Sequence, residues 1–328
     1  MKPIFFKFYE SCIPVIGVNR AVIYDLIRGN LYFLPKHILS EFVNYSEYEI
    51  DKFYFDFKES SSTLKKYFNY LLENELIFYT EYPKRFPKLN TEIIKPYPVD
   101  VLFLEIDDLD LVIHKMLDVE IINTLGISNV VLVSQKNSYE KLIFILEMLE
   151  NSKVTNITLL IKYDVNIEIN LKKELKNNLQ IQEVIIFDSI KNYDNKNFIY
   201  VCDSLSDFLT KRINGIDDFV LNQDAYLEGI SKNLYFNRKI YIDNDYNIKH
   251  GFEDSFNYGN LKKDSIENII FSKPFSELWN ITKDQIEVCK NCEFRYICPD
   301  NRIPLKRKEN DYYHQTDCNY DPYKNKWK

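Results

Sequence analysis

The sequence predicts an α/β chain of three regions, residues 1–90, 91–215 and 216–328. In the first region short apolar strands mix with helical patterns, and in the second the strand–helix alternation is regular. The third region contains four of the six cysteines, Cys289, Cys292, Cys298 and Cys318. Regular alternation is typical of parallel strands joined by right-handed crossovers, and clustered cysteines are typical of a metal-binding module.

Composition limits the classes of function. The chain has 328 residues, 45% of them hydrophobic, and a formal net charge of −7, which argues against a nucleic-acid binder driven by counterion release. No apolar run is long enough to cross a membrane, and Met1–Phe6 shows no secretory signal. We therefore expect a cytoplasmic protein without a membrane partner, in which clustered thiols hold a metal rather than form disulfides.

Residues 1–90 predict a small domain of strands around helices. Gly29 marks a turn between two strands, Pro35 opens one helix, and Ser60–Ser62 can cap the next. The expected strands are 5–9, 21–28, 30–34 and 77–80, and the first helix reaches about Val43. Short strands around helices in a domain of this size suggest a winged-helix-like unit. Such a unit serves either as a packing module or as a peptide-recognition domain that adds an extended peptide to a strand edge. Cys12 and His37 are interpreted as residues without a chemical role.

Residues 91–215 predict a partial barrel or an open parallel sheet. The expected strands are 99–105, 129–133, 157–161, 183–187 and 198–201, with helices up to 125 and over 139–149 and 171–179. There is no glycine-rich phosphate loop. The acidic residues after the first strand, Glu105, Asp107, Asp108 and Asp110, could bind a cation or a basic peptide, but a solvated acidic loop is the simpler interpretation. His114 has no evident partner.

The third region contains the ligand candidates. Cys289, Cys292, Cys298 and Cys318 are separated by two, five and nineteen residues, and two-residue spacing is typical of metal ligands. A zinc ion or an iron–sulfur cluster suits four thiolates, and free or disulfide-bonded cysteines are the alternative. Strands at 237–243 and from Ile248, and helices at 265–270 and 274–281, come before them. We expect Phe294, Tyr296 and Ile297 to shield the centre. The basic stretch 302–308 either meets an acidic peptide or, more simply, is solvated.

The cysteine spacing, with the runs 312–314 and 320–323, resembles a SPASM domain, an auxiliary cluster module found behind radical S-adenosylmethionine enzymes that modify peptides. Residues 241–243, 247–249 and 258–261 are similar to the entry hairpin of that module. The whole chain most resembles the SPASM-domain maturase of grasp-with-spasm peptide systems, clearly over 237–328 and diffusely before. In those systems the gene partner is an ATP-grasp ligase, and the product is a ribosomally made, post-translationally modified peptide.

The departures from this resemblance limit what it implies. The four ligands of the second SPASM cluster map onto Cys289, Cys292, Cys298 and Cys318, whereas the first cluster's ligands are missing. Gly251 or its neighbour His250 stands where one cysteine is expected, and Arg302 stands four residues after Cys298. The resemblance therefore implies one [4Fe–4S] cluster, with one Zn²⁺ as the alternative. Because the redox partner sites are missing, we expect a structural rather than a redox role. His250 is either a substitute ligand or a plain loop histidine.

The three-cysteine motif of radical S-adenosylmethionine enzymes is missing from the whole chain. The middle region thus looks like a degenerate radical SAM-like partial barrel, and neither S-adenosylmethionine nor radical chemistry is expected. The resulting expectation is an accessory or maturation protein that binds a precursor (leader) peptide and acts with an ATP-grasp ligase. The alternatives are a peptide-modifying oxidoreductase using the single cluster and a zinc-stapled scaffold. No catalytic residue is identifiable.

Overall fold

The computed structural model describes residues 3–45, 49–58, 61–92, 95–109, 117–174 and 178–328. The chain forms two compact units, each built from separate stretches of sequence. The first unit consists of residues 1–93, 212–235 and 281–328, and the second of residues 94–211 and 236–280. The predicted domain boundaries near residues 90 and 215 stay predictions. So does the prediction that residues 1–90 form a winged-helix-like domain. No helix in the described ranges is long and apolar enough to span a membrane.

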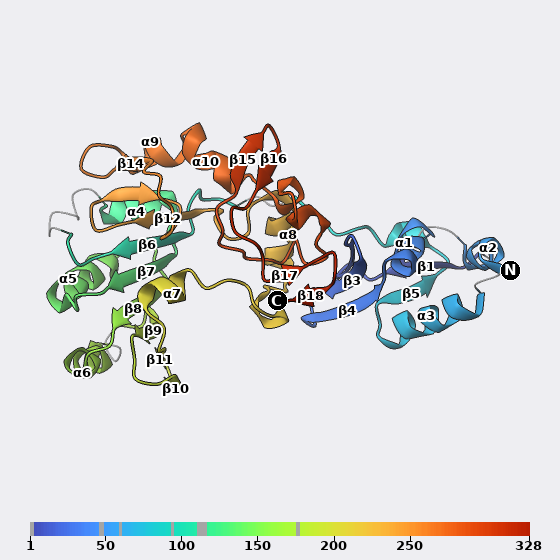
Figure 1. Cartoon of the computed structure of the whole chain (residues 1–328), viewed down its shortest axis with the longest axis horizontal. Coiled ribbons are helices and arrows are strands. Elements are labelled where there is room, and N and C mark those ends of the chain that lie inside the picture. Colours follow the sequence, from blue (N-terminus) through green and yellow to red (C-terminus); the bar gives the residue numbers. More distant parts are fainter. Residues whose placement is uncertain (1–2, 46–48, 59–60, 93–94, 110–116, 175–177) are drawn as a thin grey trace. The chain divides into compact units, whose positions relative to one another are not determined.

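The second unit is built on a nine-stranded sheet in the order β10–β11–β9–β8–β7–β6–β12–β13–β14. The five neighbouring pairs from β11 to β12 are parallel, which confirms the parallel pairing expected from the sequence. Figure 1 shows β6 to β9 side by side. The strands are β6 (Val101–Glu105), β7 (Asn129–Ser134), β8 (Asn156–Lys162), β9 (Ile181–Phe187), β10 (Tyr193–Asn195), β11 (Phe198–Tyr200), β12 (Lys239–Ile242), β13 (Asn247–Lys249) and β14 (Gly259–Asn260).

Helices connect these strands at nearly all the expected places. The helix expected at 171–179 instead covers Val165–Glu174, because the Asp164 side chain accepts the Asn166 N–H at 2.7 Å and starts the helix earlier. The short helix α7 was not expected. The helices are α4 (Val119–Leu125), α5 (Tyr139–Leu149), α6 (Val165–Glu174), α7 (Leu205–Leu209), α9 (Ile266–Ile270) and α10 (Lys273–Trp279).

The strand expected to open the cysteine region belongs to the parallel sheet instead. β12 lies beside β6 in parallel register, with Ile240 opposite Leu102 and Ile242 opposite Leu104. Both of these β12 isoleucines are fully buried. An apolar strand is stabilised by the unpaired edge that β6 offers, so chain proximity to the cysteines does not decide where it packs.

The first unit begins with a three-stranded antiparallel sheet in the order β2–β3–β4. The hairpin at Gly29, where φ is +68°, joins β3 to β4 as expected. The unit's elements up to residue 80 are β1 (Phe5–Phe8), β2 (Cys12–Ile16), β3 (Arg20–Asp25), β4 (Asn30–Pro35), α1 (Lys36–Tyr45), α2 (Ile50–Asp56), α3 (Ser61–Glu73) and β5 (Ile77–Thr80). Of these, β2 and α2 were not expected, and the Ser60 cap lies outside the described residues.

The two faces of this sheet pack on different partners. Side chains on one face, including Ile23 and Leu34, join the aromatic core of α1, α2 and α3 around Phe42 and Phe68. Side chains on the other face pack on the cysteine segment. There Val22, Tyr24 and Phe33 meet Phe294, Ile297 and Tyr320. Burial on both faces explains why residues far apart in the sequence form one unit.

The rest of the first unit is mostly irregular chain around the cysteines. Its elements are α8 (Gln223–Ser231), β15 (Leu305–Lys308), β16 (Asp311–Tyr313), β17 (Tyr320–Asp321) and β18 (Lys326–Trp327). Figure 1 shows β17 and β18 beside β3 and β4, in agreement with the shared core.

Gly17 marks a close approach between the sheet and the cysteine loop. A Cβ atom there would lie 2.7 Å from the Arg20 carbonyl oxygen and 3.0 Å from the Glu293 amide nitrogen. We expect Gly17→Ala to destabilise the first unit by about 1–3 kcal/mol, because backbone atoms on both sides must shift. Chemical denaturation measures this. Gly215→Ala is the control, since nothing lies within 4 Å of its Cβ position; equal stability of the two variants would show that this contact is loose.

Candidate metal centre

All four predicted ligand cysteines line one pocket of the first unit. Cys289 begins a single 3-10 turn, Cys292 follows that turn, and Cys298 and Cys318 come from two later stretches. No disulfide joins any of the six cysteines, all of which lie among the described residues. The structure therefore brings together the four sulfurs that the sequence selected and leaves Cys12 and Cys202 outside this pocket.

The backbone around the cysteines forms the tight turns expected of a ligand loop. The Cys292 N–H donates to the Cys289 carbonyl at 2.9 Å. The Phe294 N–H donates to Cys292 Sγ, and the Tyr320 N–H donates to Cys318 Sγ, each at 3.4 Å. In both cases the donor lies two residues after the cysteine. At Cys292 this bond favours the thiolate form that binds a metal.

The pocket is mostly apolar around the sulfurs. Phe219, Tyr320, Val288 and Pro322 line it beside the four cysteines, which are partly accessible. Burial raises the pKa of the Cys289, Cys292 and Cys298 thiols. Neutral thiols therefore predominate without a cation, and a bound metal would displace their protons. Of the expected shielding residues, Phe294 and Ile297 are fully buried, but Phe219 was not foreseen because it lies about seventy residues before the first ligand.

Beside the sulfurs lies a buried network of charges centred on Asp300. The Lys283 ammonium donates to Asp300 Oδ2 at 2.9 Å, and Arg302 donates to both carboxylate oxygens at 2.9 and 2.8 Å. These three side chains are each less than 10% exposed. The expectation that the basic stretch 302–308 is solvated is thus wrong for Arg302, whose charge is paired inside, whereas Leu305–Lys308 is exposed.

The charges in this network shift one another's pKa values. Burial alone would raise the pKa of Asp300, but the Lys283 charge, the nearby His314 ring and the hydrogen bonds from Arg302 hold it well below its usual range. Burial alone would lower the pKa of Lys283, but the Asp300 charge and hydrogen bond raise it, and ionised Cys289 and Cys298 would raise it further. Lys283 and Arg302 therefore stay cationic and supply positive charge close to the sulfurs, which suits a centre made of four thiolates.

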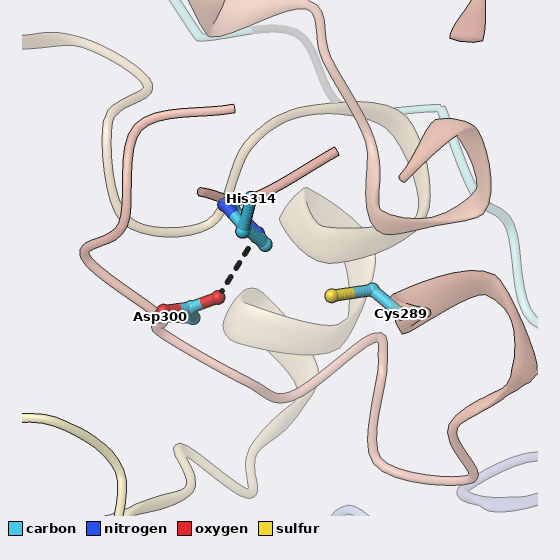
Figure 2. Close-up of side chains that lie close together, drawn as sticks. All are labelled: Cys289, Asp300 and His314. Carbon is cyan, nitrogen blue, oxygen red and sulfur yellow. Dashed lines mark ion pairs between the residues drawn. The ribbon is translucent and has the colours of Figure 1, made fainter. Parts of the chain in front are cut away.

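Cys289, Asp300 and His314 form a second group of possible ligands. Their ligand atoms all lie within 4.8 Å of one another, and Figure 2 shows the three side chains pointing toward a common point. His314 Nε2 is 3.2 Å from Asp300 Oδ2. Both oxygens of Asp300 already accept hydrogen bonds from Lys283 and Arg302, so this carboxylate is better placed to support the cysteines than to bind a metal itself.

The acidic candidates of the parallel sheet have structural roles. Asp107 is buried and accepts hydrogen bonds from Ser134 Oγ and the Gln135 N–H, both at 2.6 Å. Glu105 is held by Tyr241 and Asn244, and Asp108 pairs with Lys136. The expectation of a solvated acidic loop is wrong for Glu105 and Asp107, because side-chain and backbone donors converge on both carboxylates at this end of the sheet. Asp110 and His114 lie outside the described residues.

His250 lies in the second unit among aromatic rings. It is 3% exposed, its ring stacks on Phe275 with centroids 4.0 Å apart, and Tyr258 packs against its edge at 4.7 Å. Burial lowers its pKa to about 3. Within the described residues it belongs to no group of close metal-binding side chains. These surroundings are those of a core histidine. The interpretation of His250 as a plain loop histidine is therefore wrong, because the side chain is buried.

Because His250 is neutral when folded, it should make the second unit sensitive to acid. The unfolded chain takes up the proton near the ordinary value of about 6.5, so stability is complete above that pH and falls as the pH drops toward 3. Between about pH 7.5 and pH 5 we expect a loss of about 2 kcal/mol from this residue. His250→Phe should remove that part of the slope in urea titrations; an unchanged slope would contradict the burial.

The fold and this site define the chain as a mixed α/β protein with a four-cysteine pocket. No family model matches it, and no curated protein does. Among solved structures, it is similar to selenomethionine BtrN in an open conformation, with 15% identity over 60% of this chain and 94% of BtrN and a TM-score of 0.36. It is also similar to SuiB of Streptococcus suis bound to S-adenosylmethionine, with 11% identity over 90% of this chain and 95% of SuiB and a TM-score of 0.31. At similarity this low, only the chain's own geometry bears on its function.

Proposed function

We propose that the chain is an accessory or maturation protein for a ribosomally made, post-translationally modified peptide. It binds the precursor's leader segment on its first sheet and acts with an ATP-grasp ligase, without radical chemistry of its own. The observation that carries the proposal is the packing of the four-cysteine pocket against the three-stranded sheet within one unit. That pairing joins the SPASM-like segment to a surface suited to an extended peptide.

The outer edge of β4 is the surface we propose for the peptide. In an antiparallel ladder, residues alternately point their N–H and C=O groups toward one neighbouring strand and the other. The bonds from the Gly17 N–H to the Arg20 carbonyl and from the Leu26 N–H to the Ser11 carbonyl show which residues of β3 face β2. The other residues of β3 face β4, and the β3–β4 register gives their partners there. By this alternation the N–H and C=O groups of Leu31 and Phe33 point away from β3. Among the described residues no further strand pairs with β4, so these groups are available to an added strand.

The opposite edge of the sheet, on β2, is a poor place for a peptide. Its outward groups belong to Cys12, Pro14 and Ile16. The Cys12 N–H already donates to the Tyr9 carbonyl, Pro14 has no N–H, and the Ile16 carbonyl accepts from Arg295. The contrast between the two edges supports β4 as the docking strand.

The proposed centre is a [4Fe–4S] cluster held by Cys289, Cys292, Cys298 and Cys318. A zinc ion with bonds of about 2.3 Å would hold its four sulfurs about 3.8 Å apart. Among the described residues no three of these cysteines have sulfurs within 4.8 Å of one another. In a cluster each thiolate binds a different iron, so wider spacing supports the cluster over zinc. When bound, it would hold three stretches of chain together, and it could also carry one electron.

The test is binding of the leader segment of a short peptide encoded beside this gene. Leu31→Pro removes one outward N–H, and Leu31→Ala keeps it. We expect fluorescence-anisotropy titrations to show at least tenfold weaker binding for Leu31→Pro and near-normal binding for Leu31→Ala. Deleting residues 1–90 would be a poor test, since it would uncover the core shared with the cysteine segment.

Two outcomes would overturn the proposal. No binding of the leader by the metal-loaded wild type would remove the peptide role. A mass change in the precursor produced by this protein alone would favour the alternative of a peptide-modifying oxidoreductase.

A further inference from the structure

The loop between Cys289 and Cys298 is clamped to the ends of β2 and β3. The Val18 N–H donates to the Asn291 carbonyl at 2.8 Å. Arg295 Nη1 donates at 3.0 Å both to the Ile16 carbonyl and to the Cys292 carbonyl, so one guanidinium joins β2 to a ligand residue. The position of the ligand loop and the position of these strand ends are therefore set together.

Glu293 extends this connection into β3. Its side chain is fully buried, and Oε1 accepts hydrogen bonds from Arg20 Nε at 2.9 Å and from the Tyr320 hydroxyl at 2.6 Å. Tyr24 donates to the Glu293 carbonyl. Glu293 directly follows Cys292, and Tyr320 lies two residues after Cys318. One carboxylate thus ties the first strand of the β3–β4 hairpin to two of the stretches that carry cysteines.

Phe33 brings the connection to the docking edge on β4. Its ring lies 5.9 Å from the ring of Phe294 in an edge-to-face arrangement, and the Arg20 guanidinium sits 4.0 Å above it. Phe294 is the residue whose N–H donates to Cys292 Sγ. Only two contacts, ring to ring and N–H to sulfur, separate the peptide edge from a ligand atom.

We propose that occupancy of the four-cysteine centre sets the order of the β2–β3–β4 sheet and thereby the strength of docking on β4. Arg20, Glu293, Phe33 and Phe294 form the connection. The effect on docking rests on the proposed function, whereas the effect on the sheet does not. Coupling between two binding events is reciprocal, so a peptide bound on β4 must in turn strengthen metal binding by the same factor. Because Phe33 lies on the connection, we also expect its loss to weaken the hold on the metal.

The first test compares metal release from two variants of one strand in the full, metal-loaded chain. Phe33→Leu removes the ring that meets Phe294, whereas Tyr32→Leu, on the opposite face, changes a ring that packs against the helical core. A coloured chelator should extract metal from Phe33→Leu on the order of tenfold faster than from wild type, and from Tyr32→Leu at the wild-type rate. Equal rates for all three proteins would overturn the proposal.

The second test needs no variant and no peptide. Hydrogen exchange is followed in residues 20–34 of the wild type, loaded and stripped of metal, with β7 and β8 of the second unit as internal control. We expect exchange in 20–34 to rise on the order of tenfold on stripping while β7 and β8 stay unchanged. Unchanged exchange in 20–34 overturns the coupling. If exchange rises but the loaded protein binds no leader peptide, the coupling stands and the proposed function fails.

Discussion

Replacing Cys298 by alanine is expected to abolish retention of the metal and to unfold the chain around the pocket. Three thiolates remain, but Cys298 is the only ligand from its stretch, so without it the metal no longer ties that stretch to the other two. A structural metal can contribute on the order of 10 kcal/mol to the folding of a small domain. Metal analysis and thermal unfolding should therefore show a metal-free protein whose first unit melts far below that of the wild type.

The matched control is Cys202→Ala, which removes an exposed cysteine outside the pocket. It should leave both metal content and melting temperature unchanged. If Cys298→Ala retained a full complement of metal, the four cysteines would not act as one ligand set.

Replacing Asp300 by asparagine is expected to destabilise the first unit by about 3–5 kcal/mol, because two buried cations lose their shared partner. Lys283 and Arg302 would both face an amide whose Nδ2 is itself a donor. Since both cations also lie near Cys289, the variant should hold metal less firmly. Urea denaturation of the loaded protein measures the first effect and chelator competition the second.

Asp317→Asn serves as the comparison for that experiment. The Asp317 side chain is 92% exposed and pairs with Lys328 at 2.9 Å on the surface, so its loss should leave the stability of the first unit nearly unchanged. If the two variants were equally stable, the charges around Asp300 would be solvated rather than buried.

Local pattern was enough to find most of the fold. Apolar runs such as 129–133 and 183–187 can be buried on both faces only in a covered parallel sheet, and β7 and β9 lie where those runs predicted. Which distant segments pair with one another was harder to predict from the sequence. Lys239–Ile242 reads as a strand in either region, and only the open edge of β6 decides that it joins the parallel sheet.

The candidate site likewise has a part that the sequence predicts and a part that it does not. The cysteines are found from spacing because a short loop limits where two thiolates can point, and all four line one pocket. Their supporting groups carry no such signal. Lys283, Asp300 and Arg302 look like surface charges in the sequence, and their burial follows from tertiary packing alone. The same holds for Glu293, whose partner Arg20 lies 273 residues away.

Iron, sulfide and zinc analysis of the anaerobically purified full chain tests the central claim most directly. The account predicts iron and inorganic sulfide in equal amounts, about four of each per chain, lost in Cys298→Ala and kept in Cys202→Ala. One zinc per chain with the same dependence on Cys298 would contradict the cluster but leave the four-cysteine centre. Protein that binds neither iron with sulfide nor zinc would contradict the centre itself.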